Sequence, residues 1–219
     1  MATHEHDHEH DPNRFGAAGQ AAEWDARYGE RDDAMWSGRP NGRLVAEVAE
    51  LPPGRALDVG CGEGADAIWL AHRGWSVAAI DVSDVAIGRA RAAATREGVD
   101  VEWTCGDALG TPFPAGSFDL VSLQYPALPK QAGDAAVRAL LAAVRPGGVL
   151  LAVYHDLDDE HRAHMKDRGF DVADYVGADD LVVHLADDFT IELHAAEPRV
   201  DPPPDTPHLA DVVVRARRR

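Results

Sequence analysis

The sequence predicts an α/β fold in which a mostly parallel, seven-stranded sheet is doubly wound, with helices on both faces. The first observation is a regular alternation of short apolar segments with longer amphipathic ones, the pattern of strand–helix–strand units. The second is residues 149–155, which are apolar almost throughout, as a strand buried on both faces should be. Strands are expected at residues 55–59, 75–81, 99–107, 117–125, 149–155, 189–200 and 209–218.

Capping residues mark the ends of the predicted helices. A helix that begins near residue 21 ends at Gly29, and Pro52-Pro53-Gly54 ends the next one. Ser83 is a favourable N-cap and Gly98 a favourable stop for the helix between them. Helices are expected at residues 21–30, 43–51, 64–74, 83–98, 131–148 and 177–188, the fifth ending in Pro-Gly-Gly.

Composition limits the class of protein. A chain of 219 residues with 45% hydrophobic residues can bury one good core. No apolar run approaches the roughly 18 residues of a membrane span, and the first residues lack the apolar core of a signal peptide. Two cysteines, Cys61 and Cys105, do not form a disulfide framework. We therefore expect a cytoplasmic protein with reduced thiols and no membrane partner.

The formal net charge of −17 argues against a nucleic-acid partner, because such a surface repels a phosphate backbone. The basic end at residues 215–219 is too short to change this expectation, and we interpret it as a solvated terminus. The sequence indicates no particular oligomeric state.

Residues 1–12 alternate histidine with acidic residues, and we expect residues 1–19 to form a disordered, His-rich tail. The histidine spacing is not that of a closed zinc site, so we expect at most weak binding of divalent metals there and no metal centre elsewhere. The remainder, residues 20–219, is predicted to be one domain. Within it, residues 20–53 form a helical lid and residues 54–219 the α/β core.

The segment LDVGCGEG, residues 57–64, places glycines directly after the first predicted strand. Gly60, Gly62 and Ala65 satisfy the dinucleotide pattern G-x-G-x-x-G/A, and Asp81 follows roughly 20 residues later, as that pattern expects. A nicotinamide-dependent oxidoreductase is therefore one hypothesis from the glycines alone.

Acidic residues after three successive strands favour a different cofactor. Asp58, Asp81 and Asp107 lie at or just after the ends of the first three strands, which ligands approach in this kind of sheet. A dinucleotide would bring its phosphates close to Asp58, which is unfavourable. S-adenosylmethionine carries an ammonium, a sulfonium and a ribose diol, all of which suit nearby carboxylates.

Several segments together resemble class I S-adenosylmethionine-dependent methyltransferases, over about residues 20–219. They are ALDVGCGEGADAIWLAHRGWSVAAIDVS, CGDAL, FDLVSLQY and LAAVRPGGVLLAVYH, in the order in which that family has its motifs. The upstream segment EWDARYGERDDAMWSGRPN is similar to the small-molecule branch that includes thiopurine and tellurite-resistance methyltransferases. The resemblance implies a Rossmann-like core and S-adenosylmethionine as the cofactor.

The resemblance also implies roles for individual residues. Gly60, Cys61 and Gly62 would pass along the methionine part of the cofactor, with Gln124 near the sulfonium. Asp81 would bind the ribose hydroxyls and Val82 would pack on the adenine. Asp107 would accept from the adenine amino group, with Ala108 beside it. The expected cofactor-binding set is Asp58, Gly60, Cys61, Gly62, Asp81, Val82, Asp107, Ala108, Gln124, Trp36 and Arg39.

Candidates for the chemistry are the side chains at the ends of the later strands. Tyr125 could orient the acceptor, and His155 could act as a base, because imidazole titrates near neutral pH. An acceptor with a low pKa, such as a thiolate, would need no base. In the lid, Trp36 offers an aromatic face for a sulfonium or a flat substrate, and Arg39 a partner for a carboxylate.

The sequence lacks the Asn-Pro-Pro-Tyr motif that family members acting on exocyclic base amines carry; here Gln124-Tyr125-Pro126-Ala127 stands at that place. We therefore predict a methyltransferase with a small-molecule acceptor. Two other hypotheses stay open: a nicotinamide-dependent oxidoreductase, and a non-catalytic metal- or ligand-binding protein.

Overall fold

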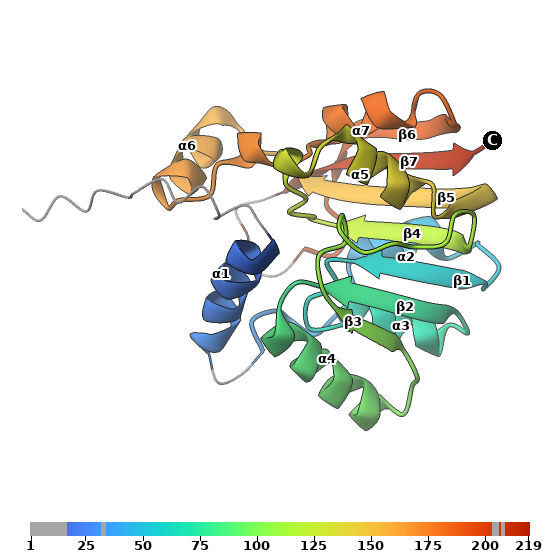
Figure 1. The fold of residues 1–219 in the computed structure, drawn as a ribbon, viewed down its shortest axis with the longest axis horizontal. Coiled ribbons are helices and arrows are strands. Elements are labelled where there is room, and N and C mark those ends of the chain that lie inside the picture. The colour runs from blue at the N-terminus through green and yellow to red at the C-terminus, as the bar shows by residue number, and fades with distance from the viewer. Residues whose placement is uncertain (1–16, 32–33, 203–205, 207–208) are drawn as a thin grey trace, which may run out of the picture.

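The seven predicted strands form one sheet in the order β3-β2-β1-β4-β5-β7-β6 (Figure 1). The computed structural model describes residues 17–31, 34–202, 206 and 209–219, so the His-rich residues 1–12 lie outside the described part. Strands β1 to β5 run parallel, and β7 pairs antiparallel with both β5 and β6. The prediction of a mostly parallel, seven-stranded sheet is confirmed. The strands are β1 (Arg55–Val59), β2 (Ser76–Asp81), β3 (Glu102–Cys105), β4 (Phe118–Gln124), β5 (Val144–His155), β6 (Phe189–Pro198) and β7 (Ala210–Arg218).

Helices cover both faces of the sheet, because each face carries its own hydrophobic cluster. On one face α5 and α7 pack on a cluster that contains Phe118, Leu150 and Leu181. On the other face α2 and α3 pack on a cluster that contains Leu44, Leu70 and Leu151. The α-helices are α1 (Ala17–Gly29), α2 (Gly42–Val48), α3 (Ala65–His72), α4 (Asp84–Glu97), α5 (Asp134–Leu141), α6 (Asp159–Asp167) and α7 (Ala178–Leu185); two 3₁₀ turns are η1 (Lys130–Ala132) and η2 (Val172–Asp174).

The helix expected over residues 131–148 is shorter than predicted. Helix α5 ends at Leu141, and β5 begins at Val144, so the Pro-Gly-Gly segment belongs to the strand. Val144 pairs with Phe118, and the register shifts before Val149 pairs with Leu120. Proline cannot continue a helix, and a Cβ at Gly148 would lie 3.0 Å from the Phe118 carbonyl oxygen. The segment therefore forms a bulge in the sheet.

Two further differences concern α1 and α6. Helix α1 begins at Ala17, inside the segment expected to be tail. Helix α6 is absent from the sequence-based expectations because it buries no residue and so carries no apolar periodicity. Its N-cap is Asp158, whose carboxylate accepts the His161 backbone N–H at 2.8 Å.

The carboxyl ends of the parallel strands lie at one edge of the sheet, and α1 and α6 stand beyond this edge (Figure 1). Ligands of such sheets bind where these ends meet. None of the helices in the described part of the chain combines the length and apolar character that crossing a bilayer requires.

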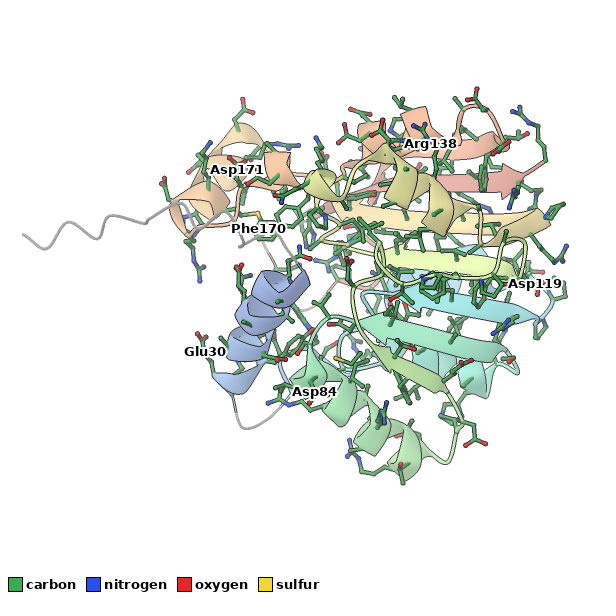
Figure 2. The ribbon with its side chains drawn as sticks, in the orientation of Figure 1. Glu30, Asp84, Asp119, Arg138, Phe170 and Asp171 are labelled. Carbon is green, nitrogen blue, oxygen red and sulfur yellow. The ribbon has the colours of Figure 1, made fainter. Side chains whose placement is uncertain are left out.

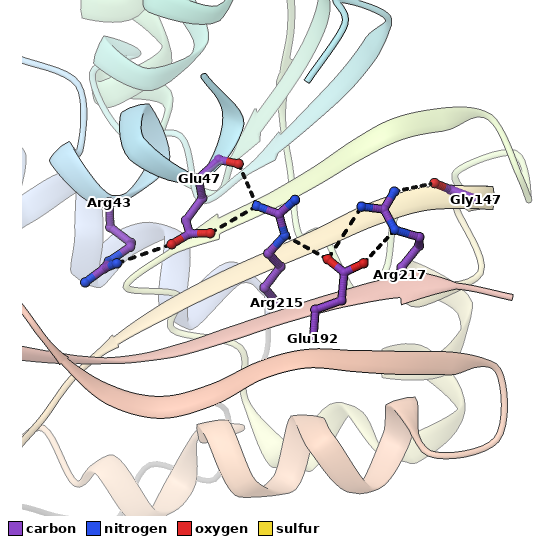
Figure 3. Close-up of polar contacts among 6 residues, drawn as sticks. All are labelled: Arg43, Glu47, Gly147, Glu192, Arg215 and Arg217. Carbon is purple, nitrogen blue, oxygen red and sulfur yellow. Dashed lines mark hydrogen bonds and ion pairs between the residues drawn. The ribbon is translucent and has the colours of Figure 1, made fainter. Parts of the chain in front are cut away.

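A chain of charges ties α2 to the antiparallel strands (Figure 3). Glu47 accepts from Arg43 at 3.2 Å and from Arg215 at 3.0 Å, while Glu192 of β6 accepts from Arg215 and Arg217 of β7 at 2.9 and 2.6 Å. Alternating charges in a network are more favourable than isolated surface pairs. This network fixes α2, which belongs to the predicted lid of residues 20–53, against the sheet.

Gly64 is required at the turn from β1 to α3. Its φ of +86° is strained for any residue with a side chain, and an added Cβ would lie 2.6 Å from the Trp103 ring. Gly88, inside α4, has nothing within 4 Å of the corresponding position.

We predict opposite effects of the same substitution at these two glycines. Gly64→Ala should lower the free energy of unfolding by at least about 1 kcal/mol because of backbone strain and the clash. Gly88→Ala should raise it by about 0.5–1 kcal/mol because alanine favours the helix. Urea unfolding of both variants measures this, and equal effects would contradict the close approach at Gly64.

Candidate functional site

A cleft of about 1690 Å³ lies at the carboxyl edge of the sheet, lined by the turns after β1 to β5, by α1 and by the segment around α6. Twelve of the residues expected at the site line it; the thirteenth, Asp58, does not. Asp58 is 2% exposed in β1, beneath the glycine loop. The lining residues are Trp36, Arg39, Gly60, Cys61, Gly62, Asp81, Val82, Asp107, Ala108, Gln124, Tyr125 and His155.

The Asp81 carboxylate holds the glycine loop in place. Its Oδ2 accepts the Gly62 N–H at 2.8 Å and its Oδ1 accepts the Ser83 N–H at 2.9 Å. The backbone N–H groups of Gly60 and Cys61 both donate to the Ile80 carbonyl, at 2.8 and 3.1 Å. A Cβ at Gly60 would meet nothing within 4 Å, so the loop faces open space there.

Three carboxyls lie around this loop, of which Asp58 is buried and Asp66 and Asp81 are half-buried. Burial, followed by the nearby Asp66 and Asp81, raises the pKa of Asp58 well above its usual range. Burial also raises the pKa of Asp66 to about 6, although its Oδ1 accepts the Asn41 N–H at 2.6 Å. Burial likewise raises the pKa of Asp81. A group of acids held this way favours a cation over a phosphate in the space above the loop.

The cofactor positions expected after β3 and β4 also lie at the cleft. Asp107 accepts the Leu109 N–H at 2.9 Å, and Ala108 is buried beside it. The Gln124 amide donates to Ser122 Oγ at 3.0 Å, while its Oε1 is buried without a hydrogen-bond partner. Burial first, then Asp58 and Asp81, raises the pKa of the Cys61 thiol, so this thiol is a poor nucleophile.

The Glu63 carboxylate holds the segment that follows α1 against the glycine loop. Its carboxylate accepts the N–H groups of Met35 and Trp36, each at 3.0 Å, and an ion pair from Arg89 at 2.8 Å. Arg89 also donates to the Tyr28 carbonyl at 3.0 Å, which joins the end of α1 to the same point. The backbone of Met35 and Trp36 is therefore held against the loop by one carboxylate.

The two lid residues expected at the site occupy different environments. Trp36 is exposed, but its indole N–H donates to the Tyr28 hydroxyl at 3.1 Å, which lies over Gly62. Arg39 is exposed and pairs with Asp201 at 3.0 Å. Trp36 thus stands next to the loop, whereas Arg39 joins the N-terminal segment to the connection between β6 and β7.

Tyr125, His155, Arg199 and Asp211 form a polar cluster at the β4–β5–β7 side of the cleft. Tyr125 has a left-handed backbone, with φ of +52°, and its ring stacks on His155 with centroids 4.1 Å apart. Its hydroxyl donates to Asp211 Oδ1 at 3.1 Å, and burial, then Asp211, raises the pKa of this hydroxyl to about 12. Arg199 lies over the Tyr125 ring at 5.3 Å. The structure thus brings both predicted catalytic candidates together.

Aromatic rings from α1 and from the segment after α6 form the outer wall of the cleft. Phe170 and Tyr175 stack at 4.6 Å, and Phe170 points toward α1 (Figure 2). The Arg27 guanidinium lies 5.0 Å over the Trp24 ring and 5.8 Å over the Phe170 ring. This wall offers flat apolar surface to a ligand that enters beside the strand ends.

Sequence reasoning missed four residues that build the site. Glu63 and Asp66 stand within or next to the glycine loop, where an acid that does not contact a ligand leaves no distinctive pattern. Asp211 had a usable signal, because it is an acid directly before three valines in the predicted last strand. Arg199 follows β6 and had no signal of its own. In the described part of the chain no three His, Cys, Asp or Glu side chains could hold a metal ion together.

Comparisons with known proteins agree with this geometry. Residues 56–148 match a family described as a methyltransferase domain. The chain is 40% identical over 114 residues to 2-methyl-6-phytyl-1,4-hydroquinone methyltransferase of Synechocystis, which covers 50% of this chain and 35% of that protein. It is 33% identical over 106 residues to ribosomal RNA small subunit methyltransferase C of Alcanivorax borkumensis, covering 46% and 32%. The chain thus spans about a third of the length of these two curated relatives.

A solved structure resembles most of the chain. Its title is "Conversion of a Disulfide Bond into a Thioacetal Group during Echinomycin Biosynthesis", and the likeness has a TM-score of 0.71, 28% identity and 91% coverage of both chains. The resemblance to class I S-adenosylmethionine-dependent methyltransferases is confirmed.

We predict that Glu63→Gln weakens the attachment of the Met35 and Trp36 backbone to the glycine loop. The amide keeps the shape of the carboxylate but loses the charge that binds Arg89 and two backbone N–H groups, and charged hydrogen bonds are the stronger ones. Hydrogen exchange at the Met35 and Trp36 amides should become roughly tenfold faster or more. Glu97→Gln, which alters an exposed pair with His72, is the control and should leave these amides unchanged. Equal exchange rates in Glu63→Gln and the unmodified chain would contradict the prediction that Glu63 holds these two residues in place.

We also predict a pH effect from Asp66. Because its pKa is about 6 in the folded chain and near 3.8 when unfolded, the folded state holds more protons between these values, and stability falls as pH rises through this window. Asp66→Asn keeps the Oδ1 acceptor and removes the charge. The variant should show a smaller fall between pH 4 and 6.5, and gain on the order of 1–2 kcal/mol at pH 7. Urea unfolding at several pH values measures both the pH dependence of stability and the gain at pH 7. The same pH dependence in Asp66→Asn as in the unmodified chain would contradict the prediction.

Proposed function

We propose that this chain, which has the fold of class I methyltransferases and matches a methyltransferase domain over residues 56–148, transfers a methyl group from S-adenosylmethionine to a small molecule. The observation that carries the proposal is the glycine loop, which Asp81 holds next to the acids Asp58 and Asp66, whose pKa values are raised by burial. It provides close backbone approach together with an environment for a cation.

The donor set of the cleft fits this cofactor. Gly60 leaves room for the methionine part, and Gln124 offers a buried Oε1 acceptor without a partner. Asp81 would bind the ribose diol, and Asp107 with Ala108 would hold the adenine. When bound, the cofactor supplies a methyl group on a positively charged sulfur, which keeps the bonding electron pair as the methyl leaves.

The nicotinamide hypothesis fits these residues less well. A dinucleotide would place two phosphates on the glycine loop, directly above Asp58 and Asp66. Burial already makes the ionised forms of Asp58 and Asp66 costly, and a pyrophosphate would add repulsion to them. A purely metal-binding role would depend on residues 1–12, which lie outside the described part of the chain.

The size and walls of the cleft support a small-molecule acceptor. A pocket for one drug-sized ligand measures roughly 300–1,000 Å³, so 1690 Å³ has room for the cofactor and a second molecule. The stacked Phe170 and Tyr175 suit a flat or apolar acceptor. One matched relative is named for ribosomal RNA, but the net charge of −17 disfavours a polyanion here.

The chain's own residues would act mainly by positioning and by excluding water, since the methyl donor is already activated. Gln124, the last residue of β4, and Tyr125, which follows it, would stand between cofactor and acceptor. His155 would be available to take a proton. The cleft would be closed over the cofactor by Trp36, which Glu63 holds in place, and by Arg39.

Calorimetric titration with S-adenosylhomocysteine tests the proposal. We expect binding to the unmodified chain and at least tenfold weaker binding to Asp81→Ala, because the variant loses both the ribose acceptor and the anchor of the loop. Asp134→Asn, an exposed acid on α5, is the control and should bind normally. If Asp81→Ala bound S-adenosylhomocysteine with unchanged affinity, Asp81 would not be the residue that binds the ribose hydroxyls. No binding at millimolar ligand, with tight binding of a nicotinamide cofactor, would overturn the proposal.

A further inference from the structure

We propose that Gln20 is a specificity-determining residue for the methyl acceptor: its side-chain amide binds an oxygen at the far end of a flat molecule that lies along the inner face of α1. The proposal rests on the proposed function and narrows the acceptor to a flat molecule with a carbonyl, ether or hydroxyl oxygen remote from the atom that is methylated. Gln20 lies before the matched methyltransferase domain, which begins at residue 56, and the site expected from the sequence does not include it.

Gln20 lines the cleft with a buried amide that lacks an acceptor. Only 5% of the residue is exposed, and its Nε2 is buried with no hydrogen-bond partner in the described part of the chain. Burying an amide donor is costly unless it is hydrogen-bonded, and buried side-chain donors are nearly always paired. An apolar side chain at this position of α1 would avoid that cost. The amide is therefore suited to an oxygen that a ligand brings into the cleft.

Gln20 belongs to a line of three side chains on one face of α1. Residues four positions apart lie on the same side of a helix, and Gln20, Trp24 and Tyr28 all line the cleft. The Trp24 and Tyr28 rings are neighbours, with centroids 6.1 Å apart. At a rise of about 1.5 Å per residue, Gln20 lies roughly 12 Å from Tyr28 along the helix axis. The inner face of α1 therefore runs along a large part of the cleft.

The two ends of this line face different parts of the cleft. The Tyr28 hydroxyl lies over Gly62, since a Cβ at that glycine would be 2.9 Å from it. The C-terminal end of α1 therefore stands at the glycine loop, where the methyl donor would bind. The N-terminal end, which carries Gln20, lies toward Phe170, whereas Glu30 marks the opposite end of the helix (Figure 2). Gln20 is thus on the side of the cleft that the donor leaves to the acceptor.

Aromatic rings between the two ends favour a flat acceptor. Trp24 stands midway between Gln20 and Tyr28 in the sequence. The Arg27 guanidinium lies 5.0 Å over the Trp24 ring and 5.8 Å over the Phe170 ring, so one cation relates both rings. A flat molecule that packs on these rings would extend from the donor toward Gln20. A site that hydrogen-bonds a substrate oxygen rejects an analogue without it, because the buried donor is then left unpaired.

Nuclear magnetic resonance of the full-length chain, with nitrogen-15 in its glutamine side chains, tests where such a molecule binds. The chain has three glutamines, and replacing each in turn by methionine assigns the amide signals of Gln20, Gln124 and Gln131. The probes are 1-indanone and coumarin, which are flat and carry a carbonyl, and indene, their oxygen-free counterpart. With S-adenosylhomocysteine present, both carbonyl probes should move the Gln20 signal. The signal of Gln131, which is exposed and does not line the cleft, should stay in place.

Calorimetry with the same probes measures the discrimination. The carbonyl probes should bind the unmodified chain at least about tenfold more tightly than indene, because they add one hydrogen bond to a buried amide. Gln20→Met nearly keeps the size of the side chain but removes its N–H donors, so the preference should fall below about twofold. Gln131→Met is the matched control and should retain the preference.

The proposal is overturned if the unmodified chain shows no preference for the carbonyl probes, or if folded Gln20→Met keeps that preference. Should Gln20→Met fail to fold, the Gln20 signal is assigned by elimination from the other two variants. A Gln20 signal that the carbonyl probes leave in place then overturns the proposal. Calorimetry with S-adenosylhomocysteine alone reports separately whether the cofactor of the proposed function binds.

Discussion

The floor of the cleft depends on the Asp81 carboxylate, which binds two turns at once. One oxygen accepts from Gly62 in the loop after β1, and the other from Ser83 at the start of α4. Ser83 in turn caps α4 and donates its hydroxyl to Asp25 of α1 at 2.6 Å. Asp81 thus connects the glycine loop to the start of α4, and Ser83 extends this connection to α1. The positions of the loop and of both helices therefore depend on one another.

The electrostatics of the cleft divide it into two parts. Around the glycine loop, Asp58 and Asp66 are held with raised pKa values and favour a cation. On the β4–β5–β7 side, Asp211 is surrounded by groups that stabilise its negative charge, among them Arg199. The two environments therefore differ in the charge that they favour, positive above the glycine loop and negative at Asp211.

The sequence predicts the fold well because strand and helix composition and capping signals agree, as at Ser83 and Gly98, which cap α4 as expected. The sequence also predicts most residues that line the cleft, since the residues that follow parallel strands must meet at the carboxyl edge of the sheet. It does not place Asp58, because alternation along β1 turns that side chain away from the cleft. It does not predict the hydrogen bond between Tyr125 and Asp211 either, because these residues lie 86 positions apart in the sequence and meet only through the tertiary fold.

The strand order has a consequence for how the molecule assembles. Because β7 lies between β5 and β6, strand β6 has no place in the sheet until β7 is there, so the two strands must dock as a hairpin. Pairings across long sequence separations form slowly. The glycine loop, built from β1 and β2, can take shape before that event, whereas the Tyr125–His155–Asp211 cluster cannot. The carboxyl edge of the sheet is therefore complete only after the hairpin of β6 and β7 has docked.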